Sequence, residues 1–276
     1  MKIDAHQHFW RYTAKEYGWI DGSMRAIQQD FLPFDLRPLL QRAGFDGTVA
    51  VQARQILDET RWLLTLAEHY SFIKGVVGWV DLKSDHVDDQ LQEFSIHQKC
   101  VGVRHVVQDE PDDRFLLRES VMRGISKLRD YDLTFDLLIL PKHLPVACEL
   151  VAMFPDQPFV VDHMAKPLIR EQIMAPWEDG IRRLATFDNV YGKVSGMVTE
   201  ADWRNWQPQD FIPYLDVVFD AFGPERLMIG SDWPVCTLAG SYQRVLQIVI
   251  DYLEKFTDEQ KAAVRGDNAA RFYQLK

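Results

Sequence analysis

Short runs rich in aliphatic and β-branched residues recur eight times along the chain, and this repetition constrains the fold more than any other feature. The runs cover residues 2–9, 47–53, 73–82, 100–107, 133–140, 159–165, 189–196 and 226–235. Between them, apolar residues return every three or four positions, as at 59–69, 117–128, 144–154 and 243–253. Neighbouring runs begin on average about 32 residues apart, the length of a strand and a crossover helix. Eight such units predict an α/β fold closed into a (β/α)8 TIM barrel.

The runs follow one another without a Gly/Ser-rich or Pro-rich linker and without a strong internal repeat. We therefore expect a single domain over residues 1–276. An irregular, aromatic-rich insertion at about residues 11–33 follows the first run and is expected to lie above the strand ends as a lid. A doubly wound open sheet is the alternative, but no GxGxxG follows the first run, so a dinucleotide site has no support.

The charge balance bears on which partners the chain can have. The formal net charge is −10, which disfavours nucleic acid and anionic membranes as partners. The three cysteines are odd in number and far apart, and the first ten residues lack the apolar core of a signal peptide. These features predict a cytoplasmic protein that acts on a small molecule, and they leave the oligomeric state open.

Two histidines end the first run with a spacing that suits metal binding. His6 and His8 are two residues apart in a predicted strand, so their side chains project from one face and can hold the same ion. The carboxyl ends of the strands form the pocket of a parallel barrel. An inert pair of hydrogen-bonded histidines is the alternative for this spacing taken alone.

Reactive side chains also follow the later runs. His163 ends the sixth run, and it suits either a third imidazole ligand or an acid that polarises a carbonyl group. Asp232 follows the apolar residues 227–230 of the eighth run, where its carboxylate can contact an ion and accept a proton from water. Glu110, just beyond the fourth run, is a further candidate ligand or base, with a solvated acidic loop as the alternative.

Aromatic and polar residues near the strand ends are candidates for binding a polyhydroxylated substrate. Indole rings pack on the C–H faces of sugars, and polar side chains can bind ring hydroxyls. The candidates are Trp19, Gln52, Arg54, Arg104, His105, Lys166 and Trp233. Core packing for the tryptophans, and surface positions for Arg54 and Lys166, are the alternatives.

In its motifs the chain resembles the amidohydrolase superfamily. The motifs are the HxH of His6 and His8, the segment DHMAKP at 162–167, and GSDWP at 230–234. The similarity is greatest to the branch of sugar lactonases that includes L-fuconolactonases and L-rhamnonolactonases. Further matching stretches are residues 19–36, the VQAR at 51–54 and the segment 102–117, so the resemblance spans nearly the whole chain in order.

This resemblance implies a distorted (β/α)8 barrel that hydrolyses a sugar-acid lactone such as L-fuconolactone or L-rhamnonolactone. Water would attack the lactone carbonyl, with Asp232 as general base and acid and His163 as the second catalytic residue. The ligand set would be drawn from His6, His8, Glu110 and Asp232. The two-metal members carry a carboxylated Lys on the fourth strand and a His on the fifth, and neither is present here. The resemblance therefore implies at most one divalent ion, zinc in first place, and leaves metal-independent activity open.

Two other functions fit the same barrel. A metal-dependent decarboxylase of aromatic or unsaturated acids should gather several arginines at the strand ends, whereas only Arg54 and Arg104 qualify. A barrel that binds a ligand without catalysis would have no physical need for so many polar strand-end groups. The lactonase is the function that the sequence favours.

Overall fold

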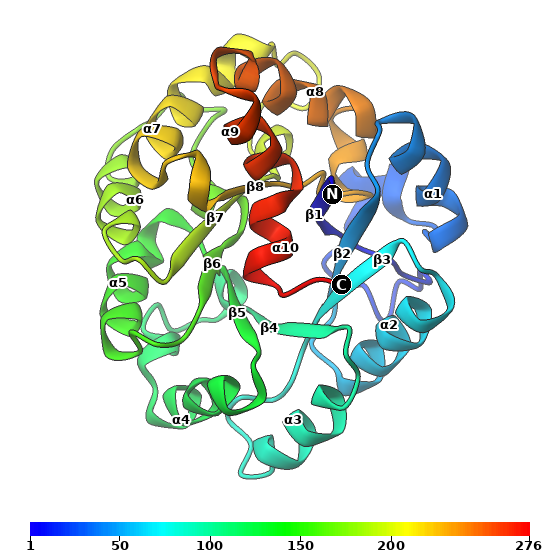
Figure 1. The fold of residues 1–276 in the computed structure, drawn as a ribbon, viewed down its shortest axis with the longest axis vertical. Helices are drawn as coiled ribbons and strands as arrows, with labels where there is room; N and C mark the ends of the chain where they lie inside the picture. The colour runs from blue at the N-terminus through cyan, green and yellow to red at the C-terminus, as the bar shows by residue number, and fades with distance from the viewer.

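Eight parallel strands form one sheet in sequence order, and ten helices surround it (Figure 1). The computed structural model describes residues 1–276. The strands are β1 Ile3–Gln7, β2 Gly47–Val51, β3 Ile73–Gly78, β4 Cys100–Val106, β5 Thr134–Leu138, β6 Phe159–Val161, β7 Val190–Val194 and β8 Leu227–Ile229. The sheet closes between its first and last strands through a parallel bridge of Gln7 with Trp233. The (β/α)8 barrel expected from the eight runs is confirmed.

Most of the helices lie on the outside of the strand ring, and the last one lies across its centre (Figure 1). The helices are α1 Pro33–Arg42, α2 Leu57–His69, α3 Val87–Ser95, α4 Glu119–Leu128, α5 Leu144–Met153, α6 Trp177–Ala185, α7 Ile212–Phe222, α8 Tyr242–Tyr252, α9 Asp258–Ala262 and α10 Asn268–Phe272. In α4, for example, Val121, Ile125 and Leu128 are buried at spacings of four and three residues. The helical periodicities found in the sequence correspond to α2, α4, α5 and α8.

Several predicted runs extend past the strands that the structure forms. The last run continues to residue 235, whereas β8 ends at Ile229, and the third run continues to residue 82, whereas β3 ends at Gly78. Apolar residues in the connecting loops are buried against the helices and therefore look like strand in the sequence. His8, His163 and Asp232 consequently lie just after strands and not within them.

The start of each strand lies at the end of the barrel that the C-terminal helix covers. Helix α10 crosses the centre of the strand ring in Figure 1, and Phe272 and Tyr273 pack with Val49, Val101 and Met228. The Asn268 amide donates to the carbonyls of Pro224 and Leu227, which join α10 to the beginning of β8. With this end filled by side chains, the opposite end is the one open to a ligand.

The insertion after β1 packs around an indole ring. Trp10, Tyr17, Ile20 and Ile27 form a small separate apolar cluster, and a short antiparallel bridge joins Trp10 to Phe31. The Trp10 indole N–H donates to the carbonyl of Gln29 at 2.8 Å. These contacts hold the insertion beside the carboxyl end of β1. No helix in the structure combines the length and the apolar character that crossing a bilayer requires.

Candidate active site

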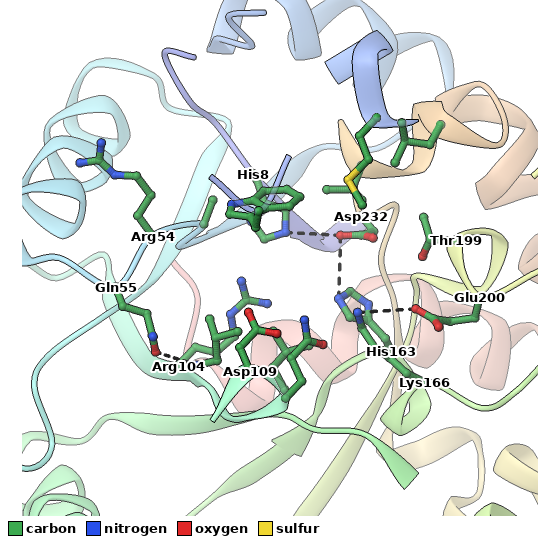
Figure 2. A pocket seen from close by; sticks show the side chains of 18 of the residues that line it. His8, Arg54, Gln55, Arg104, Asp109, His163, Lys166, Thr199, Glu200 and Asp232 are labelled. Carbon is green, nitrogen blue, oxygen red and sulfur yellow. Dashed lines mark hydrogen bonds and ion pairs between the residues drawn. The ribbon is translucent and has the colours of Figure 1, made fainter. Parts of the chain in front are cut away.

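A cavity of about 720 Å³ opens at the carboxyl ends of the strands (Figure 2). Its walls come from the insertion and from the loops after most of the strands. Lining residues with polar or aromatic side chains include His8, Glu16, Trp19, Arg54, Gln55, Arg104, Asp109, His163, Lys166, Glu200, Trp203 and Asp232. A (β/α)8 barrel presents its reactive groups at this end.

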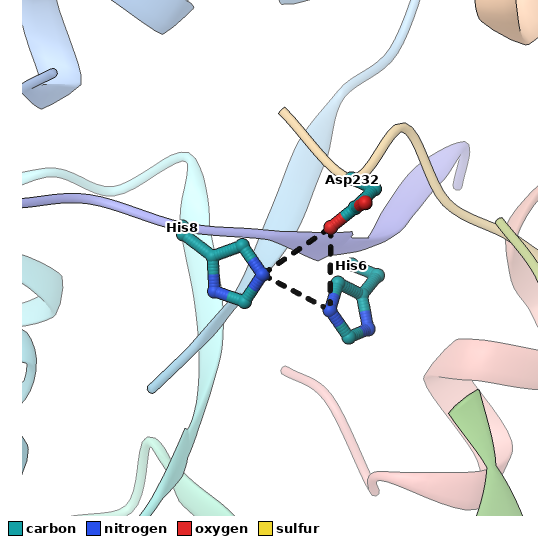
Figure 3. Close-up of side chains that lie close together, drawn as sticks. All are labelled: His6, His8 and Asp232. Carbon is teal, nitrogen blue, oxygen red and sulfur yellow. Dashed lines mark hydrogen bonds and ion pairs between the residues drawn. The ribbon is translucent and has the colours of Figure 1, made fainter. Parts of the chain in front are cut away.

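Three buried side chains converge at the base of the cavity (Figure 3). The Nε2 atoms of His6 and His8 lie 3.3 Å apart. The Oδ1 atom of Asp232 lies 3.3 Å from Nε2 of His8 and 3.9 Å from Nε2 of His6. The loop after β8 therefore meets β1 at one point, although the chain between them runs through the whole barrel.

These three atoms fit a single divalent ion. Zinc bonds of roughly 2.0–2.1 Å in a tetrahedral arrangement place ligand atoms about 3.3 Å apart, close to the spacings observed here. Imidazole nitrogen and carboxylate oxygen are donors that zinc prefers. Because all three side chains are at least 94% shielded from solvent, the geometry belongs to the interior and is not a chance surface cluster.

The second ring nitrogen of His8 contacts an acceptor, as expected for a metal ligand, whereas that of His6 lies between a carboxylate and an ammonium group. Nδ1 of His8 lies 2.8 Å from the carbonyl oxygen of Val51, which directs the lone pair of Nε2 toward Asp232. Nδ1 of His6 lies 3.4 Å from Oδ1 of Asp162. Nζ of Lys193 lies 3.2 Å from the same Nδ1 and also contacts Asp136 and Asp162.

A shift of register in β1 aims the two histidines inward. The pairing of β1 with β2 slips between Asp4 and Gln7, so β1 gains a residue relative to its partner. Asp4 accepts hydrogen bonds from Ser231 and from Tyr242 of α8, outside the strand ring. Beyond the slip, His6 lies against Asp162 and Asp232 instead.

His163 faces Asp232 across the cavity floor. Its Nε2 lies 3.8 Å from Oδ1 of Asp232, and its Nδ1 lies 2.8 Å from the Ser195 hydroxyl. Burial lowers the pKa of His163 to about 4, although the nearby charges of Asp232 and Asp162 raise it. The imidazole is therefore neutral at physiological pH. If Ser195 donates to Nδ1, Nε2 carries a proton that it can donate into the cavity.

The Asp232 carboxylate stays ionised in spite of its position. Burial by itself raises its pKa, but the charge of His163, the hydrogen bond with His8 and the charge of His6 together lower the pKa below its ordinary value. The three ion pairs of this carboxylate all use Oδ1. Oδ2 takes part in none of them, so it can accept a proton from a molecule in the cavity.

The cations that line the cavity walls are mostly paired with carboxylates. Nη1 of Arg54 lies 2.7 Å from Oε1 of Glu16, and Nζ of Lys166 lies 3.5 Å from Oε1 of Glu200 (Figure 2 shows the second pair). Nη1 of Arg104 donates to Asp162 at 3.0 Å beneath the cavity floor. The pKa of Glu200 lies above its ordinary value, because burial and the charge of Asp232 raise it more than Lys166 lowers it.

The structure brings many of the candidate residues into one place. His8, Trp19, Arg54, Arg104, His163, Lys166 and Asp232 line the cavity, and His6 lies directly beneath it. Segments as distant as the insertion and the loop after β8 therefore share one site. What each residue does there is taken up below as a proposal.

Four candidates lie away from the cavity. His105 is adjacent to Arg104 in β4 and so points to the opposite face, where it stacks on Phe115. Glu110 contacts Nε2 of that histidine at 2.7 Å and does not approach the His6–His8–Asp232 group. The expectation that Glu110 is a metal ligand and that His105 binds substrate is thus not supported by where they lie.

Gln52 and Trp233 likewise support the site without lining it. The carbonyl of Gln52 accepts from Arg104, and its side chain donates to the Arg104 carbonyl at 3.3 Å. Trp233 is 2% exposed, and its ring packs edge-on against Phe9 and Phe31. Both residues are buried because the barrel wall needs close packing there.

Several cavity residues are absent from the candidates drawn from the sequence. They include Glu16, Gln55, Asp109, Glu200 and Trp203. Glu16 lies in the irregular insertion, and Glu200 follows β7 by six residues, with no spacing pattern to mark either one. Only the convergence of loops in space identifies them.

Comparison with known proteins gives a consistent result. The model of a family described as amidohydrolase matches residues 3–275. An L-fucono-1,5-lactonase of Burkholderia multivorans is 39% identical over 286 residues, covering all of this chain and 96% of that protein. An L-fucono-1,5-lactonase of Burkholderia ambifaria is 37% identical, with the same coverage. A crystal structure of an amidohydrolase from Burkholderia multivorans with bound zinc superposes with a TM-score of 0.97, at 39% identity and over the full length of both chains.

Proposed function

The chain belongs to the amidohydrolase family, and on that premise we propose that it hydrolyses a sugar-acid lactone, with L-fucono-1,5-lactone as the first substrate to test. It is a hydrolase that acts on cyclic esters. The observation that carries the substrate proposal is the similarity to L-fucono-1,5-lactonases over the full length, joined to a cavity with His8, His163 and Asp232 at its base. The product would be the open-chain hydroxy acid.

We further propose that the site binds one divalent ion and that this ion is zinc. His6, His8 and Asp232 would hold it, and it would supply Lewis acidity and lower the pKa of water from 15.7 toward about 7. Zinc in a related structure and the donor set in this chain both support the choice.

Asp232 is the proposed general base. Its carboxylate is ionised, buried among three imidazoles and open to the cavity on one side. In this arrangement Oδ2 takes the proton of the attacking water and returns it to the ring oxygen as the ester bond breaks. The same residue thus serves both halves of the reaction.

His163 and Arg104 are the proposed donors to the oxyanion. A neutral imidazole whose Nδ1 contacts Ser195 presents N–H at Nε2, the ring nitrogen that faces Asp232. Arg104 is held by Asp162 and by the Gln52 carbonyl, so its guanidinium is in place before substrate binds. Fixed donors of this kind stabilise the tetrahedral intermediate without reorganising.

The walls of the cavity are proposed to bind the sugar part of the substrate. Trp19 is 39% exposed on the insertion, so its ring is free to cover C–H groups of the lactone. Arg54 and Lys166, with their partner glutamates, can bind ring hydroxyls as donors and acceptors. A decarboxylase would need unpaired cations for an acid substrate, and these two are paired. For location, the cytoplasm remains our proposal, consistent with three free cysteines.

The test is a pH-indicator assay of aldonolactones with zinc-loaded protein, apo protein prepared with a chelator, and Asp232→Asn. We expect wild-type protein with zinc to open L-fucono-1,5-lactone. We expect Asp232→Asn to lose about 10²–10⁴ in kcat, because the proton acceptor is gone. Zinc content is measured on every sample, so loss of metal and loss of the base are separated.

Asp156→Asn is the matched control, since it removes an exposed carboxylate far from the cavity and should keep wild-type activity. Acid release from none of the aldonolactones would refute the proposed function. An Asp232→Asn enzyme as active as wild type would refute the proposed base. Full activity of the apo protein would instead show that hydrolysis proceeds without metal.

A further inference from the structure

The two cations on opposite walls of the cavity are each neutralised by a glutamate from a neighbouring loop. Arg54, after β2, pairs with Glu16 of the insertion, and Lys166, after β6, pairs with Glu200, after β7. In Figure 2, Arg54 lies on one side of the His8–Asp232 centre, and the Lys166–Glu200 pair lies on the other. The pairs therefore set the charge on both walls.

The cavity lining carries equal numbers of formal positive and negative charges. The lining contains four cations, Lys15, Arg54, Arg104 and Lys166, and four carboxylates, Glu16, Asp109, Glu200 and Asp232. Arg104 is paired below the floor with Asp162. Lys15 is the one lining cation without an ion pair, and it lies on the exposed surface of the insertion. The walls therefore contain no buried, unpaired cation that could bind a carboxylate of the substrate.

The neutralised walls affect which substituents the lactone ring can carry, and they do not affect the ester group itself. An uncharged polyhydroxylated ring can donate to the glutamates and accept from Arg54 and Lys166 without separating either pair. A substrate with its own carboxylate must place a negative charge beside Glu16 or Glu200, or displace one of them from its cation. Repulsion between the substrate carboxylate and an adjacent glutamate opposes binding, and it is stronger in a partly desolvated cavity than in water.

We propose that Glu16 and Glu200 are specificity-determining residues, which restrict the enzyme to lactones without a further anionic group by neutralising Arg54 and Lys166. This inference rests on the proposed lactonase function and narrows its substrate class to neutral aldonolactones. The carboxylate formed by ring opening does not conflict with it, because that group appears at the reaction centre and not at the walls.

The experiment compares two matched substrates. One is an aldonolactone that the wild type opens. The other is the aldarolactone with the same stereocentres, in which a carboxylate replaces the terminal carbon group, which is CH₃ in L-fucono-1,5-lactone. The quantity measured is the ratio of kcat/KM for the neutral lactone to kcat/KM for the anionic one, in wild type, Glu16→Gln, Glu200→Gln and the double variant. We expect each single variant to lower this ratio by about tenfold and the double variant to lower it further.

Glu93→Gln is the matched control. It removes one carboxylate from a surface ion pair with Arg61, so it changes net charge by the same amount on the outer face of the barrel. Its ratio should equal that of wild type. If the control lowers the ratio as much as Glu16→Gln and Glu200→Gln do, net charge and not the cavity is responsible, and the proposal is wrong.

Wild-type protein alone provides a second measurement that needs no variant to fold. We expect it to open the neutral lactone at least about tenfold more efficiently than the anionic one. Equal efficiency for the two would overturn the specificity proposal while leaving the lactonase function intact. Hydrolysis of neither lactone would count against the proposed function itself, so the two failures are distinguishable.

Discussion

Left-handed backbone conformations collect at the residues of the active site. His163, Lys166 and Asp232 have φ values of 54°, 51° and 57°, and Gly196, beside His163, has a φ of 64°. Non-glycine residues adopt this region at a cost in free energy, and such residues cluster at functional sites. The strain marks the site independently of any side-chain chemistry.

Gly196 shows most directly what this backbone does for the site. A Cβ at this position would lie 2.5 Å from Nδ1 of His163, where the Ser195 hydroxyl now makes its contact. We predict that Gly196→Ala displaces the imidazole and lowers kcat by roughly 10²-fold, as a misplacement of about 1 Å can. Steady-state kinetics together with the melting temperature measure the effect.

Gly44→Ala separates strain from displacement. Gly44 has a similar φ of 73°, but a Cβ there meets no atom within 4 Å. This variant should lose stability comparably, by about 1–2 kcal/mol, and keep its kcat. Wild-type kcat in Gly196→Ala would show that the imidazole tolerates the added methyl group, contrary to the prediction.

At the scale of elements, α2 is joined to the insertion and to the loop after β2 by one buried carboxylate. Oε2 of Glu59 accepts hydrogen bonds from the backbone N–H of Ala53 at 3.0 Å and of Arg54 at 2.7 Å. Oε1 accepts from the Tyr17 hydroxyl at 3.4 Å. The backbone that carries Arg54 into the cavity is therefore held by this contact.

The titration of Glu59 gives a prediction about pH. Burial raises its pKa from 4.5 to about 7, although the N–H groups of Arg54 and Ala53 lower it. Between about pH 4.5 and 7 the folded state keeps a proton that the unfolded state has released. The contribution of this carboxyl to stability is therefore complete below pH 4.5 and is lost as pH rises through about 7.

We expect the free energy of unfolding of wild type, relative to Glu59→Gln, to fall between about pH 5 and pH 8. Denaturant unfolding of both proteins at the two pH values measures this difference, and contributions from other groups cancel. Glu119→Gln, at the exposed first residue of α4, is the control. A difference that does not change with pH would contradict the raised pKa.

At the scale of the whole molecule, a buried ionic network connects four strands to the C-terminal segment. Nζ of Lys193 in β7 lies 2.6 Å from Asp136 of β5 and 3.0 Å from Asp162 after β6. The Tyr273 hydroxyl donates to Asp136 at 2.7 Å, and Arg104 of β4 donates to Asp162. The network lies between the reaction centre and the end of the barrel that α10 covers.

Removing one partner from this network should destabilise the whole barrel. We predict that Lys193→Met lowers the free energy of unfolding by roughly 3–5 kcal/mol, because two carboxylates with no exposed surface lose their shared cation. Lys193→Met/Asp136→Asn should recover part of the loss. Denaturant unfolding of wild type, both single variants and the double variant completes the cycle, and strictly additive losses would mean that the pair is not coupled.

How much of this could be predicted differs between the fold and the site. The sequence predicts the eight strand runs and the periodic helices, because these depend on local spacing. For the same reason it marks reactive residues near the ends of the first, sixth and eighth runs. The apolar runs continue past the ends of β3 at Gly78 and of β8 at Ile229, because buried loops are as apolar as strands. The sequence also does not show which of the adjacent residues Arg104 and His105 points into the cavity, because that depends on the register of β4 in the barrel.

The order of elements and the kinds of reactive side chain were therefore determined by the sequence alone, because hydrophobic periodicity and residue chemistry act over a few neighbouring positions. Only the tertiary structure decided that His6, rather than Asp4, points inward, since this follows from a slip of β1 against β2. It also decided that Glu16 and Glu200 neutralise the cations of the walls. Such contacts form between loops distant in the chain, and barrel closure is what brings them together.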